Sequence, residues 1–193
     1  MRKIVLASTS PYRRTLLKQL ELPFVVASPL YIEELDQGVA PELLVKHLSL
    51  RKAESLGRHF PDALIIGADQ VFVDPRNRIL GKPAGRKEAI LQLKAMIGQR
   101  HTFYTGVTVY DSQTGEAASD YADYSVTLRE LTDAQIESYV DREKPFDCAG
   151  SFRIEGLGIA LMQKMEGEDY NALIGLPLIK LTELLSRFGI EVL

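Results

Sequence analysis

A carboxylate and an amide interrupt the most strand-like run of the sequence. This run is Ala63–Val73, ALIIGADQVFV, and its apolar first half is typical of a strand buried on both faces of a sheet. Asp69 and Gln70 lie inside it, directly after the small residues Gly67 and Ala68. An ionised carboxylate is costly to bury alone, so we expect a cation or several hydrogen-bond donors beside Asp69. Asp69 is therefore the leading candidate for a catalytic residue.

The segment after the first apolar run predicts an anion site. Residues 4–7 fit a short buried strand, and a turn with Ser8 and Ser10 then leads into a helix that opens on a proline. Ser10 is a favourable N-cap residue. Arg13 and Arg14 occupy the first helical turn, where the helix dipole disfavours positive charge. Hydroxyl, backbone N–H and guanidinium groups together favour phosphate binding; arginines that face solvent or pair with surface acids are the alternative.

A lysine interrupts the apolar stripe of a long helix, expected from Pro41 to about His59. Leu44, Leu48, Lys52 and Leu56 recur every four residues on one face of this helix. Lys52 either extends along the edge of the stripe with its ammonium group in water, or turns that group inward toward a bound anion.

Three other polar sites are open to a structural or a functional interpretation. Glu33, Glu34 and Asp36 form an acidic connector, which is either solvated or part of a metal site. Lys82 lies in a Gly-Lys-Pro loop that lacks the pattern of a P-loop. Glu155 lies among small and apolar residues, which is unusual for a carboxylate.

Composition favours a cytoplasmic enzyme or binding protein. The chain has 193 residues, 46% hydrophobic and 25% charged, and a net charge of -3, which gives no reason to expect nucleic acid or an acidic membrane as a partner. A single cysteine, Cys148, excludes a disulfide framework and a cysteine-based zinc site. Because no base partner for Cys148 can be identified in the sequence, we do not expect it to act as a catalytic nucleophile. We expect no membrane span and no signal peptide, and a single domain over residues 1–193.

Hydrophobic periodicity and turn residues predict the remaining elements. Further helices are expected over residues 86–97, 132–140 and 171–188, and further strands over residues 22–27, 101–110 and 121–128, with a short strand at the end of the chain. Thr132 and Gln135 have the spacing of a capping box at the start of one of these helices.

The chain resembles the Maf family of nucleoside triphosphate pyrophosphatases in segments spread over nearly its whole length. These segments are LASTSPYRR (6–14), RKAESL (51–56), IIGADQ (65–70), GKP (81–83), FYTG (103–106), AGSFRIEG (149–156) and IGLPL (174–178). The resemblance implies a Maf/ITPase-like α/β fold, two-lobed, with a long mixed β-sheet lining a central cleft, and commonly a homodimer. It also implies hydrolysis of a nucleoside triphosphate to the monophosphate and pyrophosphate with Mg²⁺ or Mn²⁺.

The resemblance assigns roles to the polar residues already named. Asp69 matches the general base that takes a proton from the attacking water. The cations that match positions holding the triphosphate are Arg13, Lys52 and Lys82, with Ser8 and Ser10 beside them. Phosphoryl transfer needs mainly positioning and neutralisation of charge, which three cations and a divalent metal provide.

The metal position is less regular in this chain. Glu33 matches the acidic position linked with the metal, and Asp69 is the second expected ligand. Many relatives carry an aspartate just before this glutamate, where this chain has Ile32. Whether Glu33 or Glu34 is the ligand is therefore open, and Arg14 matches no general position of the family.

Three positions in the family are associated with the choice of nucleotide. Relatives that act on dTTP and UTP carry Arg, Thr and Gln there, whereas this chain has Tyr12, Gln70 and Glu155 and resembles the subgroup that acts on 7-methyl-GTP. A carboxylate accepts both donors of the guanine edge, and a methylated, cationic base favours an aromatic face. The alternative is that Tyr12 packs on its helix and Glu155 pairs with Arg153.

Two other functions remain open from the sequence. The enzyme could prefer GTP or a pyrimidine triphosphate, dTTP or UTP. It could instead be a nucleotide-binding regulator of septum formation, although a pure sensor need not keep Asp69, Lys52 and Lys82.

Overall fold

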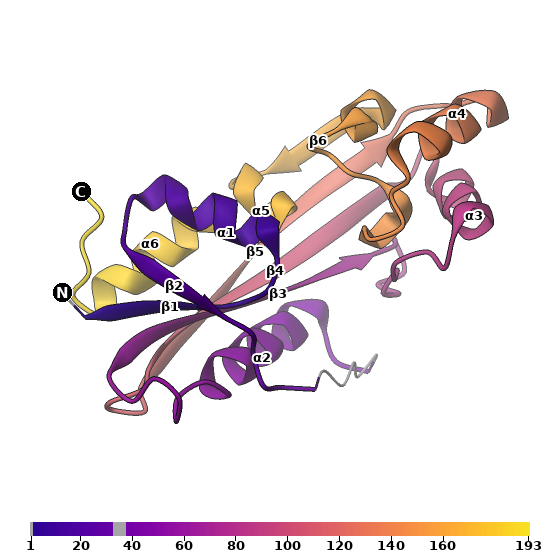
Figure 1. Ribbon diagram of the computed structural model, residues 1–193. Coiled ribbons are helices and arrows are strands. Elements are labelled where there is room, and N and C mark those ends of the chain that lie inside the picture. Colours follow the sequence, from indigo (N-terminus) through magenta and orange to yellow (C-terminus); the bar gives the residue numbers. More distant parts are fainter. Residues whose placement is uncertain (1, 33–37) are drawn as a thin grey trace. The chain divides into compact units, whose positions relative to one another are not determined.

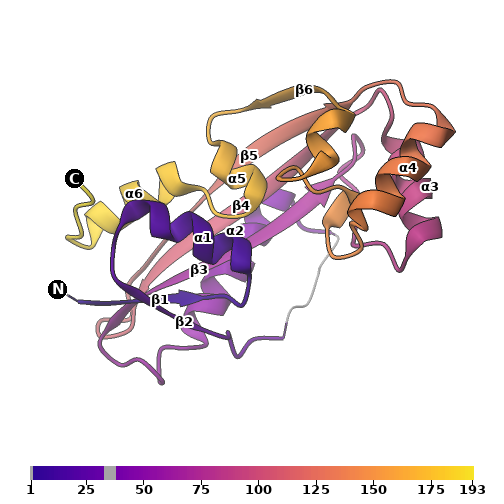
Figure 2. The same ribbon diagram turned by 45° about the horizontal axis from the view of Figure 1, so that its top comes forward.

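The computed structural model describes residues 2–32 and 38–193, which form a mixed α/β fold (Figures 1 and 2). Within these residues one six-stranded sheet has the order β2-β1-β3-β4-β5-β6. The strands are β1 (Lys3–Ala7), β2 (Phe24–Ala27), β3 (Ala63–Val73), β4 (Arg100–Asp111), β5 (Ala117–Leu128) and β6 (Met162–Gly167). β1 runs parallel to β2 and β3, whereas β5 and β6 are antiparallel. The predicted α/β fold with a mixed sheet is thus confirmed.

Six α-helices accompany the sheet in the described part of the chain. They are α1 (Pro11–Leu17), α2 (Pro41–Glu54), α3 (Arg86–Met96), α4 (Asp133–Glu143), α5 (Tyr170–Ile174) and α6 (Leu178–Arg187). Short 3₁₀ helices are η1 (Lys18–Leu20), η2 (Ala149–Ser151) and η3 (Leu157–Leu161). None of the helices in residues 2–32 and 38–193 has the length and apolar character needed to cross a bilayer.

The chain packs as two compact units with interleaved segments. Unit 1 contains Met1–Gln70, Tyr104–Asp123 and Glu168–Leu193, and unit 2 contains Val71–Phe103 and Tyr124–Gly167. The boundaries fall inside β3, β4 and β5, so each of these strands contributes to both units.

Alternating side chains on β1 and β3 build two apolar layers in unit 1. One layer joins these strands to α1 and α6, and its strand residues are Ile4, Leu6, Leu64 and Ile66. The other layer joins them to α2, and its strand residues are Val5, Ala7, Ala63 and Ile65. Helices therefore cover both faces of this part of the sheet, as Figure 1 shows. Asp69 and Gln70 consequently point to opposite faces.

An aromatic cluster forms the centre of unit 2. The ring of Phe72 lies 4.2 Å from that of Phe103 and 5.7 Å from that of Phe152, measured between centroids. Gly150 has a φ of 72°, and a Cβ there would lie 2.3 Å from the Phe72 ring. Glycine is thus required at this position both for the backbone and for the packing.

Several predicted boundaries were wrong. The expected helix over residues 171–188 is split into α5 and α6, because Pro177 lacks an N–H group and Gly175 takes a φ of 129°. The expected terminal strand does not form, and Ile190 packs on the core instead. β6 was not predicted, since its sequence MQKMEG has little apolar alternation, and α2 ends at Glu54.

Candidate active site

Two glycines allow α2 to lie directly on the sheet in unit 1. A Cβ on Gly67 would lie 2.0 Å from the carbonyl oxygen of Ser49, and one on Gly106 would lie 2.3 Å from that of Val45. Any larger side chain at either position would push the helix outward. The hydroxyl groups of Ser49 and Thr108, 2.8 Å apart, form a hydrogen bond between α2 and β4.

This close approach brings Lys52 of α2 to Asp69 of β3. The Lys52 Nζ atom donates a hydrogen bond to Asp69 Oδ1 in an ion pair, and each side chain is only 8% exposed. The cation expected beside Asp69 is therefore present, and Lys52 turns inward instead of reaching water. Because the two charges compensate each other where water has little access, removing either one takes away a buried counter-charge of the other.

The turn between β1 and α1 is built as the sequence predicts. Ser10 N donates to Ser8 Oγ (3.1 Å), and Arg13 N donates to Ser10 Oγ (3.4 Å), so Ser10 caps the helix. Arg13 Nε donates to the carbonyl oxygen of Gly175 (2.8 Å), which ties α1 to the end of α5. Arg14 is exposed, in agreement with a surface role.

Gln70 lies on the face opposite Asp69 and contacts α5. Its Nε2 atom donates to Thr105 Oγ1 (2.9 Å) and to the carbonyl oxygens of Ala172 (2.8 Å) and Leu173 (3.1 Å). Sequence reasoning missed these partners, although the FYTG segment that contains Thr105 was part of the family resemblance. Tyr12, the specificity candidate on α1, is half-buried.

Two further predicted residues belong to unit 2. Lys82 is exposed in the loop between β3 and α3. Glu155 is also exposed, before η3. Arg153, its suggested alternative partner, forms ion pairs with Glu143 (3.3 Å) and Asp147 (3.1 Å). The structure thus gives Arg153 acidic partners other than Glu155.

The structure describes only one of the two expected metal ligands, Asp69. Glu33, Glu34 and Asp36 lie outside the described residues. Across residues 2–32 and 38–193, no group of three or more His, Cys, Asp or Glu side chains is placed to hold a metal ion. Mg²⁺ commonly takes one or two carboxylates and completes its shell with water and substrate phosphate oxygens. The single carboxylate of Asp69 fits that kind of donor set.

Comparison with known proteins decides the family. The profile of the Maf family, described as Maf-like protein, matches residues 3–188. The chain belongs to the Maf family. It is 60% identical over 193 residues to a 7-methyl-GTP pyrophosphatase of Syntrophotalea carbinolica, covering 100% of this chain and 98% of that protein. It is 51% identical over 191 residues to a 7-methyl-GTP pyrophosphatase of Vibrio vulnificus, covering 99% and 97%.

A solved structure gives a more distant match. The Staphylococcus aureus Ham1 protein matches with a TM-score of 0.46 and 13% identity, over 65% of this chain and 71% of that chain.

The single cysteine of this Maf family member is poorly suited to nucleophilic attack. Burial, and then the neighbouring Asp147 carboxylate, raise the pKa of the Cys148 thiol to about 11. The thiol is therefore almost entirely protonated at neutral pH, whereas the thiolate is the nucleophile. The expectation that catalysis uses no covalent cysteine intermediate stays a prediction.

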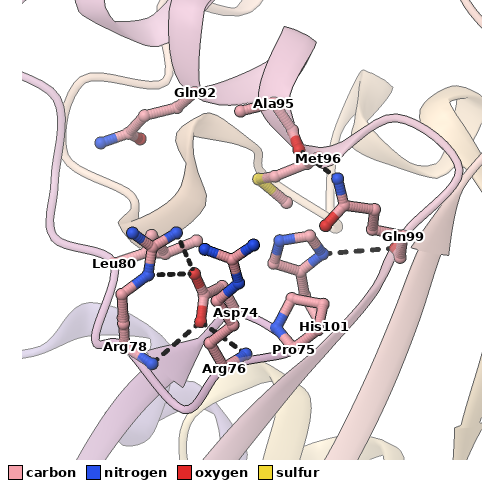
Figure 3. Close-up of a pocket in the computed structure, with 10 residues that line it drawn as sticks. All are labelled: Asp74, Pro75, Arg76, Arg78, Leu80, Gln92, Ala95, Met96, Gln99 and His101. Carbon is pink, nitrogen blue, oxygen red and sulfur yellow. Dashed lines mark hydrogen bonds and ion pairs between the residues drawn. The ribbon is translucent and has the colours of Figure 1, made fainter.

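A cavity of about 410 Å³ in unit 2 is lined by none of the predicted site residues (Figure 3). Among the lining residues, Asp74 accepts hydrogen bonds from Arg78 N (2.9 Å) and Arg78 Nε (2.7 Å). Burial alone would raise the pKa of Asp74, but these bonds lower it. Burial lowers the pKa of His101, whose Nδ1 lies 3.3 Å from the carbonyl oxygen of Gln99. The Asp74 carboxylate and the His101 ring thus have partners within the cavity wall.

Proposed function

We propose that this protein hydrolyses 7-methyl-GTP to 7-methyl-GMP and pyrophosphate. Two full-length relatives, 60% and 51% identical to this chain, are named for that activity. The observation that carries the reaction type is the buried Lys52–Asp69 pair, a carboxylate and an ammonium group held together on the α2 face of the sheet. Tyr12, Gln70 and Glu155 support the choice of nucleotide through the resemblance described above.

Asp69 is the proposed general base. Its carboxylate takes a proton from water as the water oxygen attacks the α-phosphorus, and the bond to the bridging oxygen breaks so that pyrophosphate leaves. Triphosphate oxygens compete with Asp69 for the ammonium group of Lys52. Substrate binding therefore leaves the carboxylate with less of its counter-charge, at the stage where it must accept a proton.

Cations hold the triphosphate in this proposal. Arg13, Lys52 and Lys82 bind phosphate oxygens, and Ser8 and Ser10 act by holding the β1–α1 turn, since their hydroxyl groups already accept backbone hydrogen bonds. A divalent metal, Mg²⁺ or Mn²⁺, neutralises further phosphate charge when bound. Asp69 and Glu33 are its proposed ligands, with Glu34 as the alternative to Glu33.

A panel of nucleotides tests the substrate. With Mg²⁺ present, we expect kcat/KM to be highest for 7-methyl-GTP among 7-methyl-GTP, GTP, UTP and dTTP. A higher kcat/KM for UTP or dTTP would contradict the assignment and favour the pyrimidine alternative. Tight binding of a nucleotide without turnover would favour the regulator of septum formation.

The wider setting of the enzyme is also proposed. We infer a small nucleotide as the partner molecule, with no role for nucleic acid or membrane, a homodimer, a cytoplasmic location and a single domain over residues 1–193. These features come from composition and family resemblance.

A further inference from the structure

The amide of Gln70 is held by three acceptors in unit 1, all of them at its nitrogen. The Nε2 atom donates to Thr105 Oγ1 at 2.9 Å, to Ala172 O at 2.8 Å and to Leu173 O at 3.1 Å. Thr105 is fully buried on β4, which neighbours β3 in the sheet. Its hydroxyl group donates to Ala172 O at 2.8 Å, so at Gln70 it acts as the acceptor.

These contacts determine which way the amide faces. Backbone carbonyl oxygens only accept hydrogen bonds, so the NH₂ group must face Ala172 and Leu173. The reversed amide would set Oε1 against both carbonyl oxygens, and Thr105 could bond it only by giving up Ala172. Gln70 is partly exposed, and its nitrogen is occupied. Its oxygen is therefore the atom left to meet a ligand.

We infer that Thr105 is a positioning residue for nucleotide recognition. Together with the carbonyl oxygens of Ala172 and Leu173, it holds the Gln70 amide in one orientation. Gln70 then presents Oε1 as an acceptor and reads a hydrogen-bond donor of the nucleoside. A guanine base offers such a donor in the second hydrogen of its 2-amino group, beside the two donors assigned to Glu155. The inference rests on the proposed function, because it takes Gln70 to contact the nucleotide.

A double-mutant cycle separates positioning from a purely structural role. Thr105→Val keeps the shape of the side chain and removes the hydroxyl group, whereas Thr105→Ser keeps the hydroxyl group. We expect Thr105→Val to lower kcat/KM for 7-methyl-GTP roughly three- to tenfold, mainly through KM, as for one neutral hydrogen bond. Thr105→Ser should retain most of the activity.

The same change in a Gln70→Ala background gives the decisive comparison. If Thr105 acts through the amide, Thr105→Val has little further effect once the amide is gone. An equal loss in both backgrounds, or no loss in the wild-type background, would overturn the inference.

A measurement without turnover keeps this result distinct from the proposed function. In ¹⁵N-labelled full-length protein, the Gln70 side-chain NH₂ protons should exchange slowly with water, and Thr105→Val should accelerate that exchange. Unchanged exchange in Thr105→Val would refute the positioning role. If the wild-type enzyme prefers another triphosphate, the proposed substrate is wrong, and the kinetic cycle is carried out with that nucleotide.

Discussion

At the scale of single residues, burial holds the Lys52–Asp69 pair in a fixed geometry but removes both charges from water. Each side chain is 8% exposed, so neither charge can rely on water for compensation. The pair holds the carboxylate in one orientation on a rigid strand, which suits a base that must meet a bound water molecule. Lys82 is an exposed lysine and does not hold Asp69 in place.

Substituting Lys52 and Lys82 should therefore have different effects on stability but similar effects on the kinetics. Lys52→Ala removes the ammonium partner of the buried Asp69 carboxylate and should lower the free energy of unfolding by about 3–5 kcal/mol. Lys82→Ala should change it by no more than about 0.5 kcal/mol, as expected of an exposed residue. Both should raise KM or lower kcat. Thermal unfolding and steady-state kinetics check this, and an equal loss of stability in the two variants would contradict the account.

Glu155 gives the sharpest residue-scale test of specificity. Glu155→Gln keeps the size of the side chain and replaces one acceptor oxygen with a donor group. We expect kcat/KM for 7-methyl-GTP to fall about ten- to a hundredfold, the effect of losing a hydrogen bond to a charged group. The loss for UTP should be much smaller. Equal losses for both nucleotides would mean that Glu155 has a structural role.

At the scale of elements, the close packing of α2 on the sheet at two glycines determines whether Lys52 reaches Asp69. A Cβ at Gly67 would lie 2.0 Å from the Ser49 carbonyl oxygen, whereas one at Gly85 would meet nothing within 4 Å. We expect Gly67→Ala to lower the free energy of unfolding by about 1–3 kcal/mol through overpacking, and to reduce kcat as α2 shifts. Gly85→Ala is the matched control. Full activity in Gly67→Ala would show that activity does not require the close packing of α2 on the sheet.

The elements that the sequence predicted well are those that local patterns determine. Apolar runs identified β3, and Thr132 and Gln135 form the predicted capping box. β6 owes its existence to pairing with β5 and not to its own sequence. Likewise Gln70 bonds to Ala172, 102 positions away, a contact that periodicity cannot reveal.

The candidate site was predictable to a similar degree. A carboxylate in an apolar run demands a counter-charge, so a cation beside Asp69 could be expected before its partner was known. Lys52 was expected either to reach water or to turn toward a bound anion, and its partner in the structure is the Asp69 carboxylate instead. The roles of Lys82, Glu155 and Glu33 come from resemblance, and they stay predictions.

At the scale of the whole molecule, two interleaved units share β3, β4 and β5. Asp69 and Gln70 end the portion of β3 that belongs to unit 1, and Val71 begins the portion in unit 2. Sequence identity of 60% over the full length extends across both units, so the family assignment covers the whole described fold.

Product analysis of 7-methyl-GTP hydrolysis tests the central claim most directly. The wild-type enzyme with Mg²⁺ should release 7-methyl-GMP and pyrophosphate in equal amounts. Asp69→Asn, which can still accept a hydrogen bond from Lys52, should be slower by about 10²–10⁴-fold, the usual contribution of a general base. Release of 7-methyl-GDP and phosphate, or an Asp69→Asn rate within about threefold of wild type, would contradict the account.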